Sequence, residues 1–180
     1  MQAENATATL LAVDGDCARD VGAQLKNLPA DATHLVVSVG GNDALGQAGI
    51  LSESATSFAG VVERLAQVSE SFGDAYREML QAVLSHDLPT AVCTIYYPRF
   101  GSPIEQRLTS TALAHFNDAI LRAAFVAGIP VLDLRLICSQ AADYANPIEP
   151  SSIGGAKITQ RITQLVGEHD FTSRRSEIFV

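Results

Sequence analysis

Apolar residues gather along the chain into four short runs that predict buried β-strands. These runs lie at residues 9–13, 34–39, 90–96 and 130–134. Each is rich in β-branched residues and lacks the clean alternation of apolar and polar positions that marks a half-exposed strand. Strands of this kind are covered on both faces, which is typical of parallel sheets.

Longer stretches between these runs carry apolar residues at helical spacing. They predict helices over residues 16–28, 57–84, 104–127 and 153–166. Strands that alternate with helices in this way indicate an α/β fold, with a mostly parallel sheet and helices on both faces. Neither a linker nor an internal repeat interrupts the pattern. Residues 1–180 are therefore expected to form a single domain, with residues 171–180 as a tail.

Composition narrows the classes of function. Apolar residues make up 47% of the chain, and its formal net charge is -8. A chain without a basic patch is not expected to bind nucleic acid, and no apolar run approaches the roughly 18 residues of a membrane span. The N-terminus does not resemble a leader peptide, so a cytoplasmic location is the expectation. Three scattered cysteines form no metal-binding pattern, and we expect neither a metal nor a cofactor.

The most distinctive segment is Gly40-Gly41-Asn42-Asp43, which directly follows the second predicted strand. The glycines permit a tight turn and a close approach of the backbone to a ligand. The amide of Asn42 is a neutral donor, so it can stabilise a developing oxyanion without itself titrating. The same four residues also suit a simple turn, because Gly, Asn and Asp dominate turns.

Ligands of open parallel sheets bind beyond the carboxyl ends of the strands. The segments in that position are residues 14–17, 40–43, 97–100 and 143–150. Gly41, Asp43, Tyr97 and Arg99 are therefore candidate substrate-binding residues. For Arg99 an ion pair with one of the many carboxylates is an equal alternative.

The strand that runs into Gly-Gly-Asn-Asp resembles the Asn block of the SGNH/GDSL hydrolases, a family of lipases and esterases. Residues 10–15 resemble the Gly block of that family, and residues 143–157 resemble its Asp-x-x-His block. The resemblance covers nearly the whole chain in the right order. It implies a flavodoxin-like three-layer α/β/α sandwich. It also implies that Gly15 and Asn42 form two parts of an oxyanion hole for the hydrolysis of acyl esters.

Two parts of the family pattern have no counterpart. The family's first strand, which ends in Gly-Asp-Ser, is missing, because only eight residues precede Thr9. Gly15-Asp16-Cys17 imitates that motif with a thiol but lies too close to Asn42 to replace it. In the last block, either Asn146 or Glu149 stands where the family has its histidine base, with Asp143 or Asn146 at the Asp position. None of the four histidines supplies a base: His34, His86, His115 and His169.

These departures leave two hypotheses. The chain is an ester hydrolase by descent, inactive as given because it lacks the serine and the histidine, or shortened at its start. Alternatively, it is a non-catalytic binding or interaction module for small carboxylate or acyl ligands. A nucleotide-binding domain is disfavoured, because no glycine-rich phosphate motif occurs.

The missing strand also bears on the partners. It predicts a gap beside residues 9–13, which another segment would fill within one chain or between the chains of a homo-oligomer. The strand-like residues 176–180 are one candidate donor. The expected ligand is a small-molecule ester or carboxylate, with neither nucleic acid nor a membrane as partner.

Overall fold

A parallel sheet of four strands forms the middle of the molecule. The computed structural model describes residues 7–54 and 56–180. The strands follow the order β1-β2-β3-β6 and are all parallel. The predicted α/β fold is thereby confirmed, and three of the four predicted strands are present in shorter form. The strand bounds are β1 (Leu35–Val37), β2 (Thr90–Cys93), β3 (Val131–Leu132) and β6 (Ile178–Phe179).

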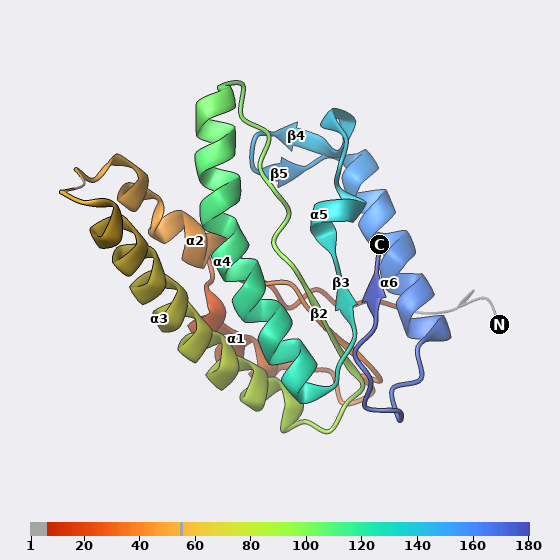
Figure 1. Ribbon diagram of the computed structural model, residues 1–180. Helices are drawn as coiled ribbons and strands as arrows, with labels where there is room; N and C mark the ends of the chain where they lie inside the picture. The colour runs from red at the N-terminus through yellow and green to blue at the C-terminus, as the bar shows by residue number, and fades with distance from the viewer. Residues whose placement is uncertain (1–6, 55) are drawn as a thin grey trace.

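Three long helices cover the two faces of the sheet. Helices α3 and α4 lie on one side and α6 on the other (Figure 1). Each follows a serine whose side chain accepts a hydrogen bond from a backbone N–H of the first turn, which is the preferred N-cap arrangement. None of the helices in the described ranges is long and apolar enough to cross a membrane. The bounds are α3 (Phe58–Leu84), α4 (Pro103–Ala127) and α6 (Ser152–Glu168).

Short elements make up the connections between strands and helices. The predicted single helix over residues 16–28 is wrong, because this stretch divides into η1 (Ala18–Asp20), α1 (Val21–Gln24) and η2 (Leu25–Asn27). Its two ends are tightened by i→i+3 bonds, from Asp20 N to the Cys17 carbonyl and from Leu28 N to the Leu25 carbonyl. The other short elements are α2 (Gly41–Gly46), η3 (Ala48–Ser52), α5 (Leu134–Ile137), η4 (Ala141–Asp143) and the antiparallel pair β4 (Tyr144–Asn146) and β5 (Glu149–Pro150).

The sheet divides the core into two layers. The first layer packs α3 and α4 against one face, around Tyr76, Phe116 and Ile120. The second packs α5 and α6 against the opposite face, around Leu132 and Leu165. All five side chains are at most 5% exposed. Both faces of the sheet are therefore buried, as its runs of apolar residues predict.

Residues 7–14 form no strand, so the strand predicted at 9–13 is wrong. Leu10 is 86% exposed and Val13 is 60% exposed. The reason lies in the sheet, which ends at β1 with no described strand between β1 and this segment. A strand requires partners for its backbone N–H and C=O groups. Residues 9–13 have the composition of a strand, but no strand within the described residues pairs with them.

The C-terminal tail is a strand, but it does not fill that gap. β6 pairs with β3, at the opposite edge of the sheet from β1. Val131 N donates to the carbonyl of Glu177 over 2.8 Å, and Phe179 is buried in the second core layer. Nδ1 of His169 lies 3.0 Å from Oε2 of Glu177, which also fastens the tail. The prediction that residues 176–180 are the donor for the gap is therefore wrong for this chain.

A buried amide fixes the path of the chain beyond β2. Asn117 of α4 is fully buried. Its Oδ1 accepts a hydrogen bond from Ile95 N over 2.7 Å, and its Nδ2 donates to the Ile95 carbonyl over 3.0 Å. The side chain thus pairs with Ile95 as a neighbouring strand would. This contact determines where the chain after β2 leaves the sheet.

Asn117→Ala is expected to lower the free energy of unfolding by about 2–4 kcal/mol, because the backbone N–H and C=O of Ile95 would lose their partners in a buried position. Urea unfolding of the two proteins measures this difference. The exposed Asn27 offers a matched control, since Asn27→Ala removes the same atoms from the surface. A loss for Asn117→Ala no larger than that of the control would show that the amide is not a structural link.

Candidate functional site

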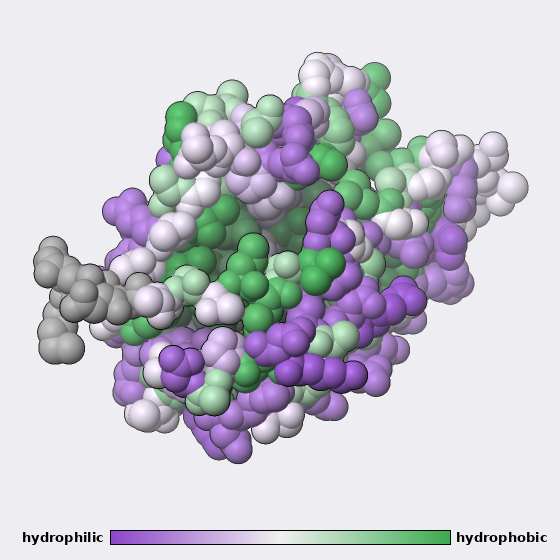
Figure 2. Space-filling view, turned by 180° about the vertical axis from the view of Figure 1, so that it is seen from behind, coloured by the Kyte–Doolittle hydropathy of each residue, from purple (hydrophilic) through white to green (hydrophobic). Residues whose placement is uncertain are grey.

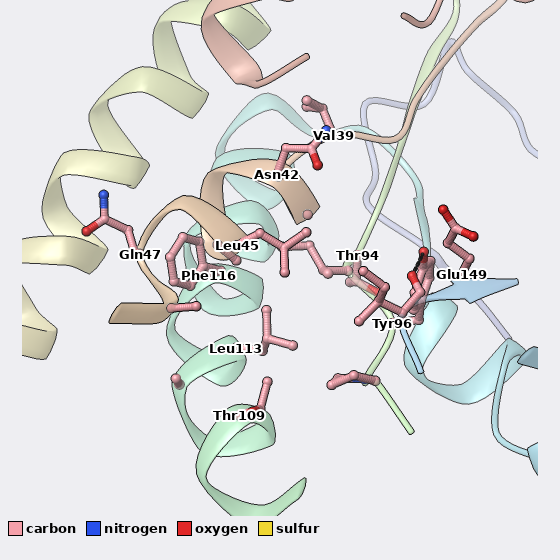
Figure 3. Close-up of a pocket in the computed structure, with 18 of the residues that line it drawn as sticks. Val39, Asn42, Leu45, Gln47, Thr94, Tyr96, Thr109, Leu113, Phe116 and Glu149 are labelled. Carbon is pink, nitrogen blue, oxygen red and sulfur yellow. Dashed lines mark hydrogen bonds between the residues drawn. The ribbon is translucent and has the colours of Figure 1, made fainter. Parts of the chain in front are cut away.

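A cavity of about 1000 Å³ opens beyond the carboxyl ends of β1 and β2. Parts of α2, α3 and α4 line it, and Figure 3 shows Leu45, Leu113 and Phe116 around it. This is the position in which open parallel sheets bind their ligands, and the volume matches the upper end of known ligand pockets, about 300–1000 Å³. The apolar wall includes Leu45, Ile50, Leu65, Val68, Ile95, Leu108, Leu113 and Phe116.

Gly40 turns the chain from β1 into α2 at the rim of this cavity. Its φ of +119° lies in the region that favours glycine. A Cβ at this position would lie 3.1 Å from Ile95 Cδ1 and 3.1 Å from Phe72 Cζ. Both the backbone angle and the lack of space therefore require glycine here. The turn places Asn42 in the first turn of α2, against the cavity.

Gly15 and Asn42 line the same cavity. Nδ2 of Asn42 donates a hydrogen bond to the backbone carbonyl of Asp16 over 2.9 Å, so the amide lies directly beside the Gly15 segment. A primary amide carries two N–H donors, and this bond uses one of them. No second hydrogen bond joins this amide to the described part of the chain. Gly15, at φ +87°, makes the turn that brings the two segments together.

Of the other two candidates in Gly-Gly-Asn-Asp, only Gly41 lines the cavity. Asp43 instead accepts a hydrogen bond from Ala18 N over 3.0 Å. It joins α2 to η1, so the structure places it as a support of the site rather than a residue of the cavity wall.

The candidate residues of the last predicted block lie in two places. Asp143 is buried away from the cavity, whereas Glu149 lies in the cavity wall. Asp143 is fully buried and does not line the cavity. Its Oδ1 lies 2.7 Å from Nζ of Lys157, and its Oδ2 accepts from Gln140 N over 2.9 Å. Burial alone would raise the pKa of this carboxyl, but the hydrogen bonds from Lys157 and Gln140 lower it below its usual value. Asp143 therefore anchors the start of α6 as an ion.

Asn146 and Glu149 lie on the β4–β5 hairpin and contact each other. Nδ2 of Asn146 is 2.5 Å from Oε2 of Glu149. Both are exposed, and Glu149 alone of the two lines the cavity. The structure thus brings Glu149 to the cavity with Gly15 and Asn42 but leaves Asp143 and Asn146 outside.

Tyr97 and Arg99 do not line the cavity. The Tyr97 carbonyl accepts a hydrogen bond from the Tyr144 hydroxyl over 2.6 Å. The Arg99 guanidinium donates to the Ser139 carbonyl, and its Cζ lies 5.6 Å from the centre of the Tyr144 ring. These contacts hold the loop after β2 against the β4 strand. Within the described part of the chain, Arg99 forms no ion pair, and it lies outside the cavity wall.

A buried polar group at the cavity was not found from the sequence. Thr94 lines the cavity; its hydroxyl donates to Oδ1 of Asp133 over 2.9 Å and accepts from Leu134 N over 2.9 Å. Burial raises the pKa of Asp133, but the stronger combined effect of hydrogen bonds from Arg135 and Thr94 lowers it. Thr94 and Asp133 directly follow β2 and β3 in the structure, but the strands predicted over residues 90–96 and 130–134 include them, so the rule for parallel sheets did not single them out.

The site thus unites two segments, one around Gly15 and one around Asn42, at the mouth of an apolar cavity. The model of a family described as GDSL-like lipase/acylhydrolase matches residues 2–154. The chain belongs to this family. The match confirms the resemblance that rests on Gly-Gly-Asn-Asp and on the order of the blocks.

Solved structures give the same fold for this GDSL-family chain. An extracellular lipase from Streptomyces rimosus has a TM-score of 0.54 and 16% sequence identity, over 76% of this chain and 64% of the lipase. An α/β hydrolase from the metagenome of Lake Arreo, Spain, has a TM-score of 0.56 and 16% identity, over 84% of this chain and 67% of the hydrolase. The chain therefore spans about two thirds of each. No curated protein sequence matches it.

The cavity of this GDSL-family chain has no histidine in its wall. All four histidines lie in the described ranges, and none of them lines the cavity. Cys17 is the one cysteine that is not fully buried. Burial raises the pKa of its thiol, and the carboxylates of Asp43 and Asp20 raise it further. A thiol that stays protonated is a weak nucleophile, and Cys17 also lies outside the cavity wall.

The ionised state of Asp143 is expected to stabilise the fold. The pKa of Asp143 is lower in the folded chain than in the unfolded chain, where it is about 3.9. Its contribution to the free energy of unfolding is therefore complete at pH values above about 3.9. The contribution is lost as the pH falls through the folded value. The free energy of unfolding, measured by urea from pH 7 to pH 2, should therefore fall more steeply below pH 4 for the native chain than for Asp143→Asn.

The exposed Asp31 offers the control for this measurement, since Asp31→Asn changes the same group where no partner surrounds it. That variant should follow the native curve. If Asp143→Asn also followed it, Asp143 would have no structural role as an ion.

Proposed function

We propose that the cavity is the acyl-binding site of a GDSL-type ester hydrolase, with the ester carbonyl held by the Asn42 amide and the Gly15 N–H. The observation that supports this most is that both residues lie at one cavity whose wall is otherwise mainly apolar. An apolar wall binds the hydrocarbon part of an ester by excluding water from it. Neutral donors at one end suit the carbonyl oxygen, on which negative charge develops during acyl transfer.

The charges around the cavity favour an uncharged ester over a free carboxylate. Its wall contains four carboxylates and, among the described residues, no lysine, arginine or histidine. A bound carboxylate would meet like charges without a cation to offset them. Of the two ligand classes, the uncharged acyl ester is therefore the better match for this cavity. The four carboxylates belong to Asp14, Asp16, Glu105 and Glu149.

The composition of the cavity wall supports binding of an ester more than its hydrolysis. Three serines line the cavity, namely Ser38, Ser52 and Ser102, but no histidine stands beside any of them there. A serine attacks an ester only when a neighbouring base takes its proton. The chain as given is therefore proposed to bind acyl esters without appreciable turnover.

Binding of a neutral ester and of its acid at pH 7.5 separates the two ligand classes. We expect methyl decanoate to bind at least about tenfold more tightly than decanoate, a difference of about 1.4 kcal/mol, in isothermal titration calorimetry. Added salt should strengthen only the binding of decanoate, because it screens the repulsion. Decanoate that binds as tightly as the ester would exclude the proposed ligand class.

A substitution of Asn42 tests the proposed role of its amide. Asn42→Ala should weaken the binding of methyl decanoate, whereas Asn27→Ala, at an exposed position away from the cavity, should leave it unchanged. Thermal unfolding of both variants establishes that they are folded.

Turnover is tested with p-nitrophenyl decanoate and with a fluorophosphonate probe that labels activated serines. The chain as given should hydrolyse the ester no faster than buffer does and should remain unlabelled. Stoichiometric labelling of one serine would show that an activated nucleophile is present after all, and the proposed lack of turnover would then be wrong.

A further inference from the structure

One end of the cavity is formed by the loop after β2 and by the two elements beside that loop. The residues that line the cavity there are Tyr96, Pro98, Phe100, Glu105 and Glu149. Glu105 belongs to the first turn of α4 and Glu149 to β5, whereas the other three belong to the loop. We name these five residues the loop end of the cavity. The loop end combines two aromatic rings with two carboxylates.

Hydrogen bonds hold this loop between its two acidic neighbours. On one side, the Tyr96 hydroxyl donates to the carbonyl of Ile148 over 2.8 Å. On the other side, Phe100 N donates to Oε1 of Gln106 over 2.9 Å. In each case the residue next to the acceptor in the sequence is one of the two loop-end glutamates. The two half-buried rings and the two carboxylates are therefore held together at one end of the cavity.

Neither glutamate of the loop end has a cation beside it. Among the described residues, no lysine, arginine or histidine forms an ion pair with Glu105 or Glu149. Glu149 accepts a hydrogen bond from Nδ2 of Asn146, but a carboxylate has about four acceptor positions. Burial raises the pKa of the Tyr96 hydroxyl, and Cys138 and Glu149 raise it further. The negative charge of Glu149 therefore acts directly on the aromatic part of the loop end.

We propose that the loop end binds the ammonium group of a cationic alcohol, so that the preferred ligand of the cavity is the acyl ester of an amino alcohol. Aromatic faces attract an ammonium group through their quadrupole, and carboxylates attract it through their charge. An uncharged alcohol gains neither attraction. This inference rests on the proposed function, since it names the class of alcohol in the ester that the cavity is proposed to bind.

The cavity has a place for each part of such an ester. The two neutral donors take the carbonyl oxygen, and the apolar wall around Leu113 and Phe116 takes the hydrocarbon chain. Figure 3 shows Tyr96 and Glu149 on one side of the cavity, apart from Leu113 and Phe116. Figure 2, which views the molecule from behind, shows a hollow with a hydrophobic floor and a partly hydrophilic rim. A ligand with an apolar chain and a cationic head matches this division.

A metal ion is a poorer match for the loop end than an ammonium group. Ca²⁺ takes about six to eight oxygen ligands, whereas no group of three His, Cys, Asp or Glu side chains within the described residues is placed to hold a metal. Aromatic rings are not ligands of such hard cations, but they are the usual partners of large organic cations. The chemistry of the loop end therefore favours the organic cation.

The test compares hexanoylcholine with 3,3-dimethylbutyl hexanoate, in which a carbon atom replaces the charged nitrogen and the shape stays the same. Isothermal titration calorimetry of the full chain at pH 7.5 measures both dissociation constants. We expect hexanoylcholine to bind at least about tenfold more tightly, because only the charged ester gains the attraction of the rings and carboxylates. Added salt should lower this ratio, since it screens the attraction and leaves the neutral ester unaffected.

A double variant assigns the preference to the loop end. Glu105→Gln with Glu149→Gln keeps the shape of both side chains and removes their charges, so the ratio should fall at least about fivefold while the affinity for the neutral ester stays unchanged. Glu78→Gln is the matched control, because Glu78 is exposed on α3 and lies outside the cavity wall. Thermal unfolding establishes that each variant is folded, and the salt dependence of the native chain tests the same claim without a variant.

The possible outcomes separate this inference from the proposed function. Equal binding of the two esters would overturn the cationic alcohol and leave ester binding in place. A preference for hexanoylcholine that the double variant keeps in full would overturn its assignment to Glu105 and Glu149. If neither ester bound at millimolar concentration, the proposed function would be wrong, and this inference would be wrong with it.

Discussion

Two side-chain hydrogen bonds hold the amino-terminal segment against the rest of the protein. Asn42 donates to the Asp16 carbonyl, and Asp43 accepts from Ala18 N. Since residues 7–14 belong to no sheet, no ladder of backbone bonds positions Gly15. The segment Gly-Gly-Asn-Asp therefore has two tasks: it turns the chain at the end of β1, and it brings Gly15 to the cavity. The proposed carbonyl-binding geometry depends on these two bonds.

The sequence patterns predicted the layers of the fold well and the amino-terminal segment badly. The run 90–96 holds a strand because β1 and β3 supply partners on both sides, whereas no strand within the described residues pairs with residues 9–13. Glycine and asparagine at a strand end indicated the Asn42 site only together with the order of the other blocks, because the same residues also suit a simple turn. Arg99 could not be assigned, because its partners, the Ser139 carbonyl and the Tyr144 ring, are about 40 residues away in sequence.

The site combines an apolar cavity with an acidic rim and neutral donors. On the proposed function, its carboxylates would repel a free fatty acid, while its apolar wall would favour the hydrocarbon chain of an ester. Asp143, one of the two candidates for the position of the family's acidic residue, is ion-paired with Lys157 of α6 and lies outside the cavity wall. Among the described residues, the cavity of this family member brings Gly15 and Asn42 together and is lined by three serines but by no histidine.

The central claim is that Gly15 and Asn42 donate hydrogen bonds to one carbonyl oxygen. The ¹³C NMR shift of methyl decanoate labelled at the carbonyl carbon reports this directly, because hydrogen bonds to the oxygen move that resonance downfield. The account predicts a downfield shift in the bound ester relative to the ester in a hydrocarbon solvent, and its loss in Asn42→Ala. A bound ester whose resonance equals that in hydrocarbon would contradict the account.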